Sequence, residues 1–493
     1  MDHECRGGQT YEELKIFTQQ LAKKFCACLA RLYILALVCG VTGCASAPSH
    51  SGIQVETPSQ QVDAPELPLK KSSIPKIQAG EKILSTAQAR KLLRSAWKNS
   101  YTTLLRLAQV EENITGDPLI AGNKVTLLFD GPQTMAAMMA AAKTAKDHIN
   151  LETYIFDQDE IGMRFAELLI ERQRAGIQVQ IIYDSIGTLG TPDTFFERMR
   201  MAGIRLLEFN PIAPWRAAGP WSPNHRDHRK IMVVDGQIAF TGGVNISSAY
   251  ANSSLFRSKK HSQATVGWRD THVQIEGPAV AALQLSFLTT WNSQQAPLLA
   301  DHDYFPELKI QGEQLVRVLL SEPDSAHDIY NAYLAALNQA KKSIHITCAY
   351  FVPTDEIMHV LIAAAKRGVD VKIILPGASD SALVTNASRS YFSTMLAAKI
   401  KIFLLNVAVL HAKTAVIDRA WGTVGSTNID ARSLLLNNEV NLMVFSEAFA
   451  LTLENAFTED LLSSKEITAA AWADRAFSTR AKEWLARQVA PWL

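Results

Sequence analysis

Apolar and polar positions follow the same order twice along the chain. In the first copy, helical spacing ends at Ala145-Lys146, and strand-like alternation, helical spacing and an apolar run follow at 149–156, 161–174 and 179–183. In the second copy, the series begins before Ala340-Lys341 and continues at 344–351, 357–366 and 371–375. Short, nearly continuous apolar runs beside helices are typical of buried parallel strands. The pattern therefore predicts two βαβ units in an α/β fold.

A glycine follows the helix of each unit, Gly176 in the first copy and Gly368 in the second. Glycine is a common C-terminal helix cap because it adopts a left-handed backbone conformation without strain. The repeat thus includes matching turns as well as matching hydrophobicity. We expect two similar lobes at residues 86–300 and 310–464, joined near 297–312.

Less regular segments flank the repeat. Residues 44–85 are rich in Ser, Pro and Gln and predict a flexible tether, and 87–107 has the spacing of a first helix. Residues 465–493 predict an amphipathic helix, in which basic residues accompany Trp472, Phe477, Trp484, Leu485 and Trp492. We expect this helix to dock on its own lobe, and the alternative is that it lies on a membrane.

The N-terminus predicts a signal segment at residues 1–43. Basic residues, the last of them Arg31, precede an apolar run at 32–43 that is too short to span a bilayer. The run ends at a Gly-Cys pair that contains Cys44. This resembles a bacterial lipoprotein signal, in which the cysteine is acylated; a plain secretory signal or an uncleaved anchor is the alternative. With lipid on Cys44, only Cys348 is left as a thiol, so no disulfide forms within the mature chain.

Composition and charge narrow the class of partner. The 493-residue chain is ordinary for a globular protein, with 47% apolar and 20% charged residues. Its 49 basic residues nearly balance 48 acidic ones, for a formal net charge of +1. A dedicated nucleic-acid-binding protein usually has a clear basic excess. The charge therefore argues against a nucleic acid as the partner.

Each lobe carries the same polar motif, His-x-Lys-x4-Asp followed by a small pair and an asparagine. The two copies consist of His228, Lys230, Asp235, Gly242-Gly243 and Asn245, and of His411, Lys413, Asp418, Gly425-Ser426 and Asn428. Two matches at the same place of a repeat are much stronger evidence than one. We therefore expect these residues to form the functional site.

The spacing within the motif favours phosphate chemistry. Residues two apart on a strand point to the same face, so each histidine is expected to lie beside its lysine. An ammonium group repels a metal cation but attracts a phosphate anion, which the asparagine and the glycine-rich turn can also bind. Breaking a phosphodiester through a covalent intermediate needs a nucleophile and a separate proton donor. Two imidazoles that face each other supply both.

The paired motifs resemble the phospholipase D superfamily over residues 120–464. Four flanking segments are similar to bacterial cardiolipin synthases: Ile149–Gly162, Asn224–Lys230, Trp268–His272 with Glu276-Gly277-Pro278, and Leu410–Thr414. The resemblance implies two tandem phospholipase D-like α-β-α lobes with pseudo-twofold symmetry and one active site at their interface. It also implies a phosphohistidine intermediate, with no metal and no other cofactor. Lys399–Leu405 departs from the family, which often has a glycine and an aromatic–acidic strand here.

The resemblance also implies roles for the histidines and for two acidic residues. His228 is the nucleophile and His411 the acid/base, although the reverse order stays open. Asp270 and Glu439 stand where the family often places carboxylates that orient the opposite histidines. His225 and His272 are near the motif or these carboxylates, and we expect structural roles for both.

Further roles concern the remaining motif residues. The resemblance implies that phosphate binds to Lys230, Lys413, Asn245 and Asn428, and the turns add Gly243 and Ser426. The catalytic motif also includes Asp235 and Asp418, for which the alternative is that they close the turns after their strands.

Two segments suggest a rim that meets lipid. Arg257, Lys259, Lys260 and His261 form a basic run, which is either a solvated loop or a surface for anionic headgroups. Trp215 and Trp221 stand among prolines before the first motif, and they either pack on the lobe or enter the bilayer interface.

The leading hypothesis is a phosphatidyltransferase of the cardiolipin synthase kind. It transfers a phosphatidyl group through a phosphohistidine onto phosphatidylglycerol. A phospholipase D or phosphodiesterase with water as acceptor is the first alternative, and a membrane-tethered nuclease or an inactive scaffold follows. The expected partners are a membrane surface and phospholipids, with phosphatidylglycerol as the first candidate and phosphatidylethanolamine as the second. We expect the bacterial cell envelope as location, with a lipid anchor and a periplasmic orientation.

Overall fold

The computed structural model describes residues 74–217, 219, 221–250, 267–379 and 381–490. The predicted signal at 1–43, the acylated Cys44, the basic run at 257–261 and Trp492 lie outside these residues. Within the described ranges, no helix is both long enough and apolar enough to cross a membrane.

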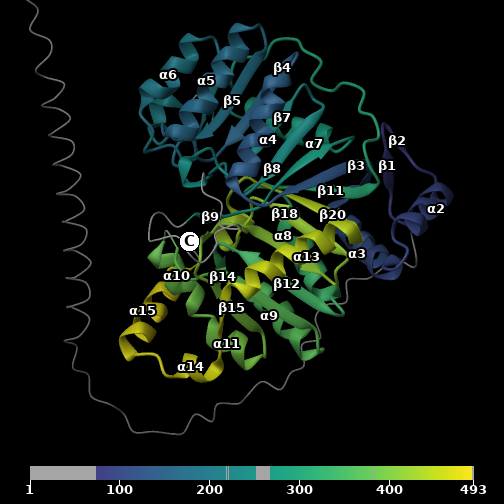
Figure 1. The fold of residues 1–493 in the computed structure, drawn as a ribbon, viewed down its shortest axis with the longest axis vertical. Helices are drawn as coiled ribbons and strands as arrows, with labels where there is room; N and C mark the ends of the chain where they lie inside the picture. Colours follow the sequence, from purple (N-terminus) through teal and green to yellow (C-terminus); the bar gives the residue numbers. More distant parts are fainter. Residues whose placement is uncertain (1–73, 218, 220, 251–266, 380, 491–493) are drawn as a thin grey trace, which may run out of the picture. The chain divides into compact units, whose positions relative to one another are not determined.

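The first lobe extends from strand β3 to helix α7 (Figure 1). Its elements are β3 (Leu119–Leu128), α4 (Gly131–Thr144), β4 (His148–Thr153), α5 (Glu160–Arg174), β5 (Gln178–Asp184), α6 (Asp193–Met201), β6 (Arg205–Phe209), η1 (Pro214–Arg216), β7 (Ile231–Val234), β8 (Ile238–Gly242), η2 (Ser248–Tyr250), β9 (Trp268–Arg269), β10 (His272–Glu276) and α7 (Val280–Ser293).

The second lobe repeats the same series and adds a C-terminal extension. Its elements are β11 (Gln314–Ser321), α8 (Asp328–Gln339), β12 (Ser343–Cys348), β13 (Phe351–Val352), α9 (Asp355–Lys366), β14 (Asp370–Pro376), α10 (Ala382–Arg389), α11 (Phe392–Ala397), β15 (Lys401–Leu405), β16 (Val409–Leu410), β17 (Lys413–Ile417), β18 (Trp421–Gly425), β19 (Ile429–Asp430), α12 (Ala431–Leu435), β20 (Glu439–Phe445), α13 (Glu447–Leu462), β21 (Ser464–Ile467), α14 (Ala469–Ala473) and α15 (Phe477–Gln488).

The strands of the two lobes pair in the same order. Neighbours in the first lobe run β6-β5-β4-β7-β8-β10-β3, parallel among the first three and antiparallel beyond. The second lobe runs β15-β14-β12-β17-β18-β20-β11 with the same directions. β3 and β11 pair antiparallel, so the lobes share one sheet, and Figure 1 shows β3, β8, β11, β18 and β20 close together. Because equivalent strands meet antiparallel, a local twofold axis relates the lobes.

The two predicted βαβ units are present. The predicted helices correspond to α5 and α9, and the predicted strands correspond to β4, β5, β12 and β14. Asp159 and Thr354 begin the helices, because their side chains accept the backbone N–H of Gly162 and Ile357. Gly176 and Gly368 follow the helices with φ of 94° and 88°, as the predicted left-handed caps require.

Apolar side chains from both lobes share a core. Ile231 and Val273 of the first lobe belong to the same buried cluster as Val424, Leu442 and Phe449 of the second. Each lobe also has a cluster made mostly of its own residues. Buried apolar area contributes roughly 25 cal/mol per Å². The shared cluster therefore stabilises the interface between the lobes.

The segment before the repeat differs from the prediction at two places. Residues 77–83, expected in the tether of 44–85, form β1 (Ile77–Ala79) and β2 (Lys82–Ile83), because buried Ile77 pairs with Leu119 of β3. The single helix expected at 87–107 is two helices, α2 (Thr86–Ala96) and α3 (Tyr101–Thr115). Trp97 ends α2, because its indole is buried and donates to the Phe445 carbonyl at 2.9 Å.

The C-terminal segment docks on its own lobe, although it is not one helix. β21 pairs antiparallel with β15, and α14 and α15 follow. Trp472 is 6% exposed and lies under Arg475, whose guanidinium carbon is 3.9 Å from the ring centroid. α15 packs on α10 and leaves Trp484 exposed. The predicted amphipathic helix at 465–493 is thus corrected to a strand and two short helices.

Candidate active site

The motif histidines precede strands β7 and β17 and do not lie on them. Lys413 begins β17, and Lys230 is the last residue before β7. Each lysine Nζ donates to the backbone carbonyl of its own histidine, His228 or His411, at 2.5 Å. Histidine and lysine are therefore adjacent in both motifs, as predicted. The reason differs from the prediction, because the lysine side chain folds back to its histidine and the two residues do not share one face of a strand.

Each histidine is attached to the opposite lobe through its backbone. The N–H of His228 donates to the Asn438 carbonyl at 3.0 Å, next to Glu439. The N–H of His411 donates to the Arg269 carbonyl at 2.8 Å, next to Asp270. Short β9 of the first lobe also pairs with β16 of the second. The backbone thus places each histidine beside a carboxylate of the other lobe.

The side chains complete the same crossed arrangement. His228 Nδ1 lies 3.0 and 3.1 Å from the two Glu439 oxygens, and His411 Nδ1 lies 2.8 Å from Asp270 Oδ2. We assign the Nδ1 proton to these bonds from the hydrogen-bond network, which leaves Nε2 as the other ring nitrogen. The structure therefore brings together the two histidine–carboxylate pairs that the sequence predicts.

Burial and charge set the ionisation of the site. Burial, with a contribution from Lys230 and against the opposing effect of Glu439, lowers the pKa of His228 to about 4. Burial also lowers the pKa of Lys230 to about 7. The pKa of His411 is lowered by burial and by Lys413. Because Lys413 also acts on His228 and Lys230 on His411, the two motifs form one electrostatic unit.

The two carboxylates are charged at neutral pH. Burial alone would raise the pKa of Glu439, but His228 and Lys230 lower it below its ordinary value. Burial likewise opposes His411, which lowers the pKa of Asp270. Each carboxylate can therefore stabilise an imidazolium when its histidine takes up a proton.

The small residues of the motif support the carboxylates. Ser426 Oγ donates to Glu439 and accepts the Val440 N–H at 3.0 Å. At the equivalent Gly243, a Cβ atom would lie 2.1 Å from Asp270 Oδ1, so only glycine fits there. These contacts explain why one motif has serine and the other has glycine at this place. Phosphate binding by Gly243 and Ser426 stays a prediction.

Comparisons with known proteins bear on the same residues. Residues 138–255 and 333–461, which contain both motifs, match the family model described as "Cardiolipin synthase, PLD-like domain". A cardiolipin synthase of Listeria innocua is 35% identical over 383 residues, which cover 76% of this chain and 77% of that protein. The chain belongs to the phospholipase D superfamily. The predicted resemblance to cardiolipin synthases is thereby confirmed.

Two further matches agree. Cardiolipin synthase 1 of Bacillus cereus is 35% identical over 399 residues, covering 79% of this chain and 76% of that protein. The crystal structure of phosphatidylserine synthase from Haemophilus influenzae has a TM-score of 0.58 at 13% identity, over 78% of this chain and all of that chain. The structural likeness supports the phospholipase D fold, which was predicted as two tandem lobes.

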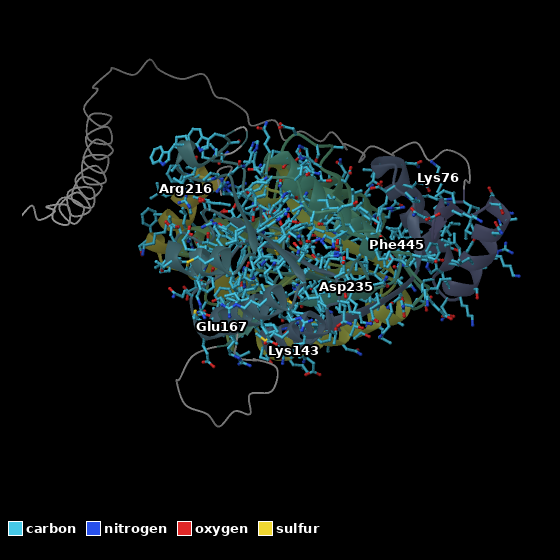
Figure 2. The ribbon with its side chains drawn as sticks, turned by 90° about the horizontal axis from the view of Figure 1, so that it is seen from above. Lys76, Lys143, Glu167, Arg216, Asp235 and Phe445 are labelled. Atoms are coloured by element: carbon cyan, nitrogen blue, oxygen red, sulfur yellow. The ribbon has the colours of Figure 1, made fainter. Side chains whose placement is uncertain are left out.

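The aspartates of the phospholipase D motif bind the backbone at the starts of β4 and β12. Asp235 accepts the backbone N–H groups of Lys146, Asp147 and His148 at 2.8–3.0 Å. Asp418 accepts those of residues 341–343 at 2.7–3.1 Å. Strand β7 or β17 separates each aspartate from its histidine along the chain. Asp235 is labelled in Figure 2, well apart from Arg216 of η1. These contacts favour a structural role for both aspartates, and their catalytic role stays a prediction.

The motif asparagines hold the loops that follow β4 and β12. Asn245 Oδ1 accepts the Ile155 N–H at 3.1 Å, and Asn428 Oδ1 accepts the Tyr350 N–H at 3.3 Å. These loops carry Tyr154 and Tyr350, whose rings lie edge-on at 5.0 and 6.4 Å from the motif histidines. Burial raises the pKa of Tyr154 to about 12, so its hydroxyl stays protonated.

Sequence reasoning missed both tyrosines as site residues. Each tyrosine directly follows a buried run that includes its strand, although the two do not align in the repeat, where Tyr154 matches Ala349 and Tyr350 matches Ile155. A tyrosine directly after each buried run was the signal available for them. Tyr250 and Trp268, which also contact His411, have no such signal, because no matching residues stand in the other lobe.

Arg229, between His228 and Lys230, is fully buried at the lobe interface. It donates to Glu322 at 2.9 Å and to Thr290 at 3.0 Å, and it lies 3.9 Å from Glu152. Burial and the neighbouring Glu152 raise the pKa of Asp227 well above its ordinary value. The guanidinium of Arg229 therefore compensates the negative charge of buried acidic side chains next to His228.

The other histidines near the site have structural surroundings. Burial lowers the pKa of His272 to about 3, and its Nδ1 accepts the Val244 N–H at 3.4 Å. The His225 carbonyl accepts the side-chain amide of Asn210. Over the described part of the chain, no group of three or more metal-ligating side chains could hold a metal ion.

Proposed function

We propose that this protein is a phosphatidyltransferase of the cardiolipin synthase type that works through a phosphohistidine. One observation carries the proposal: partly buried His228 and buried His411 each contact a carboxylate of the opposite lobe through Nδ1, beside a lysine. Membership in the family and the names of its relatives support phospholipids as the substrates.

In the first step, His228 Nε2 attacks the phosphorus of phosphatidylglycerol. The bond to the glycerol oxygen breaks, and His411 donates its proton to that oxygen, so glycerol leaves. A phosphate anion beside Lys230 and Lys413 offsets their charges and raises the pKa of His411, which makes the imidazolium available. Glu439 stabilises the positive charge on His228.

In the second step, neutral His411 takes the proton from a hydroxyl of a second phosphatidylglycerol. The resulting oxygen attacks phosphorus, the phosphorus–nitrogen bond breaks, and cardiolipin leaves with His228 restored. Water in place of the lipid hydroxyl would give phosphatidic acid, which is the hydrolase alternative. The intact histidine–carboxylate pairs argue against an inactive scaffold, and the net charge of +1 argues against a nuclease.

The experiment uses purified protein, labelled phosphatidylglycerol in detergent and product separation. We expect labelled cardiolipin and free glycerol from the wild-type protein. If phosphatidic acid is the only product, the protein is a hydrolase and not a transferase. If neither phosphatidylglycerol nor phosphatidylethanolamine gives a product, the assignment of phospholipids as substrates is wrong.

A bilayer is the proposed surface from which the substrate comes. Leu189, Ile212, Trp215 and Trp221 are exposed on the connections after β5 and β6. Both connections begin at the carboxyl ends of parallel strands, where ligands of α/β folds bind. The connection after β5 also approaches Tyr154 closely, because a Cβ atom on Gly187 would lie 2.0 Å from the Tyr154 carbonyl oxygen. Tryptophan favours the bilayer interface. The exposed side chains thus surround the approach to His228.

Trp215→Ala is expected to weaken activity on vesicles about tenfold, because it removes interfacial apolar area. Activity on a monomeric short-chain phosphatidylglycerol should stay unchanged. Trp484→Ala is the matched control, since Trp484 is an exposed tryptophan on α15. Equal losses on both substrates, or equal losses in both variants, would contradict the proposed surface.

The pH dependence of substrate capture should follow Lys230. A lysine binds phosphate when charged, and its pKa of about 7 in the free enzyme means that charge is lost as pH rises through this value. We expect kcat/KM to fall above about pH 7, and Lys230→Arg to remove this limb because arginine stays charged. A limb that persists in Lys230→Arg would exclude Lys230 as its cause.

An acylated Cys44 facing the periplasm is the proposed form of attachment. The Gly-Cys pair after the apolar run supports it. Labelled palmitate should enter the wild-type protein in cells and not Cys44→Ala; labelling of both would place the lipid elsewhere.

A further inference from the structure

Tyr250 of the first lobe reaches the proposed acid/base of the second. Its hydroxyl oxygen lies 3.4 Å from His411 Nδ1, and its ring meets the imidazole edge-on with centroids 5.7 Å apart. Asn245 Nδ2 donates to the same hydroxyl oxygen at 2.9 Å. Tyr250 is 1% exposed, so this contact is shielded from water. A motif asparagine of one lobe is thereby connected to the motif histidine of the other.

Close packing determines where the Tyr250 hydroxyl lies. A Cβ atom on Gly131, the first residue of α4, would lie 1.8 Å from the Tyr250 carbonyl oxygen, so the backbone approaches the helix as closely as glycine allows. The ring packs against Trp268 at 4.7 Å, and Trp268 lies 5.2 Å from the His411 ring. Tyr250 and Trp268 together form an aromatic wall beside the imidazole.

Among the described residues of the second lobe, no equivalent of this contact is present. Five residues after its motif asparagine, where the first lobe has Tyr250, stands Ser433. The Ser433 N–H donates to Asp430 at 2.7 Å as part of the cap of α12. His228 is instead bounded by Tyr154, and Tyr350 lies beside His411. The Tyr250 hydroxyl is therefore an addition to the pseudo-symmetric site.

We propose that Tyr250 is a positioning residue for His411, which makes the two histidines chemically unequal. The inference rests on the proposed two-histidine function. Asp270 Oδ2 lies 2.8 Å from His411 Nδ1 and takes its proton, Lys413 Nζ lies 2.9 Å from the same nitrogen, and the Tyr250 oxygen lies 3.4 Å from it. The oxygen carries partial negative charge, so it favours the imidazolium that His411 forms when it accepts the acceptor's proton. Lys413 and Lys230 destabilise the positive charge of the His411 imidazolium, and Asp270 stabilises it.

Tyr250→Phe tests the hydroxyl alone, because the ring and its packing stay. With phosphatidylglycerol we expect kcat to fall about tenfold and KM to stay within about twofold. The limb of the kcat–pH profile that reports His411 should move to lower pH, since the imidazolium loses one favourable contact. A phosphatidyl donor with p-nitrophenolate as leaving group needs no proton in the first step. Its p-nitrophenol burst should keep the wild-type rate while the transfer step slows.

Tyr333→Phe is the matched control, because Tyr333 is also buried and its hydroxyl also accepts from an asparagine side chain, Asn441. We expect wild-type kcat and an unmoved pH limb in this control. The inference is overturned when Tyr250→Phe keeps wild-type kcat, when its pH limb does not move, or when its burst slows as much as its transfer step. A wild-type protein without any lipid turnover would instead reject the proposed function.

Discussion

Replacing His228 or His411 with alanine is expected to lower phosphatidyl transfer by about 10⁴-fold. Each histidine supplies a function that the other cannot supply at the same time: one is bonded to phosphorus while the other transfers a proton. The loss should appear in kcat, because the lysines and the apolar rim that bind the lipid are unchanged. Initial rates of cardiolipin formation measure it.

His359→Ala is the control for this pair, since His359 is an exposed histidine on α9. It should keep wild-type activity. A His228→Ala or His411→Ala variant that keeps activity within about tenfold of the wild type would contradict the two-histidine mechanism.

Glu439→Gln and Asp270→Asn should each lower kcat by roughly 10³-fold, with small effects on KM. An amide has the shape of the carboxylate but cannot stabilise an imidazolium, and its NH₂ group can turn toward Nδ1 and select the wrong tautomer. Because the pairs cross between lobes, Glu439→Gln should slow the step of His228, and Asp270→Asn should slow the step of His411. Single-turnover rates with the p-nitrophenyl donor separate the two steps.

A double variant tests whether each carboxylate acts through its histidine. Glu439→Gln should cause little further loss in a His228→Ala background, because both changes remove the same unit. Independent, multiplying losses would show that Glu439 acts elsewhere than through His228.

The repeat made much of the fold predictable. The period of apolar residues located α5, α9 and their neighbouring strands, and glycine at 176 and 368 located the helix ends, because these signals are local. The histidine–carboxylate pairs followed from the resemblance, since a family motif carries long-range information that local periodicity lacks. The lobe order and the shared sheet then place Glu439 and Asp270 across the interface.

The remaining features depend on contacts between distant parts of the chain. Trp97 ends a helix because of the Phe445 carbonyl, which lies 348 positions later. Ile77 becomes part of a strand through Leu119, although the surrounding sequence is typical of a tether. Tyr250 meets His411 across 161 positions and has no counterpart in the repeat. The motif aspartates show the same dependence, because Asp235 and Asp418 accept backbone N–H groups that lie 87–89 and 75–77 positions earlier.

The most direct test of the mechanism is a burst measurement on the two histidine variants. A phosphatidyl donor with p-nitrophenolate as leaving group lets the covalent step proceed without an acid. We expect His411→Ala to release about one p-nitrophenol per active site and to retain phosphate on residue 228, whereas His228→Ala should release none. A burst from His228→Ala, or phosphate on any residue other than His228 in His411→Ala, would contradict the account.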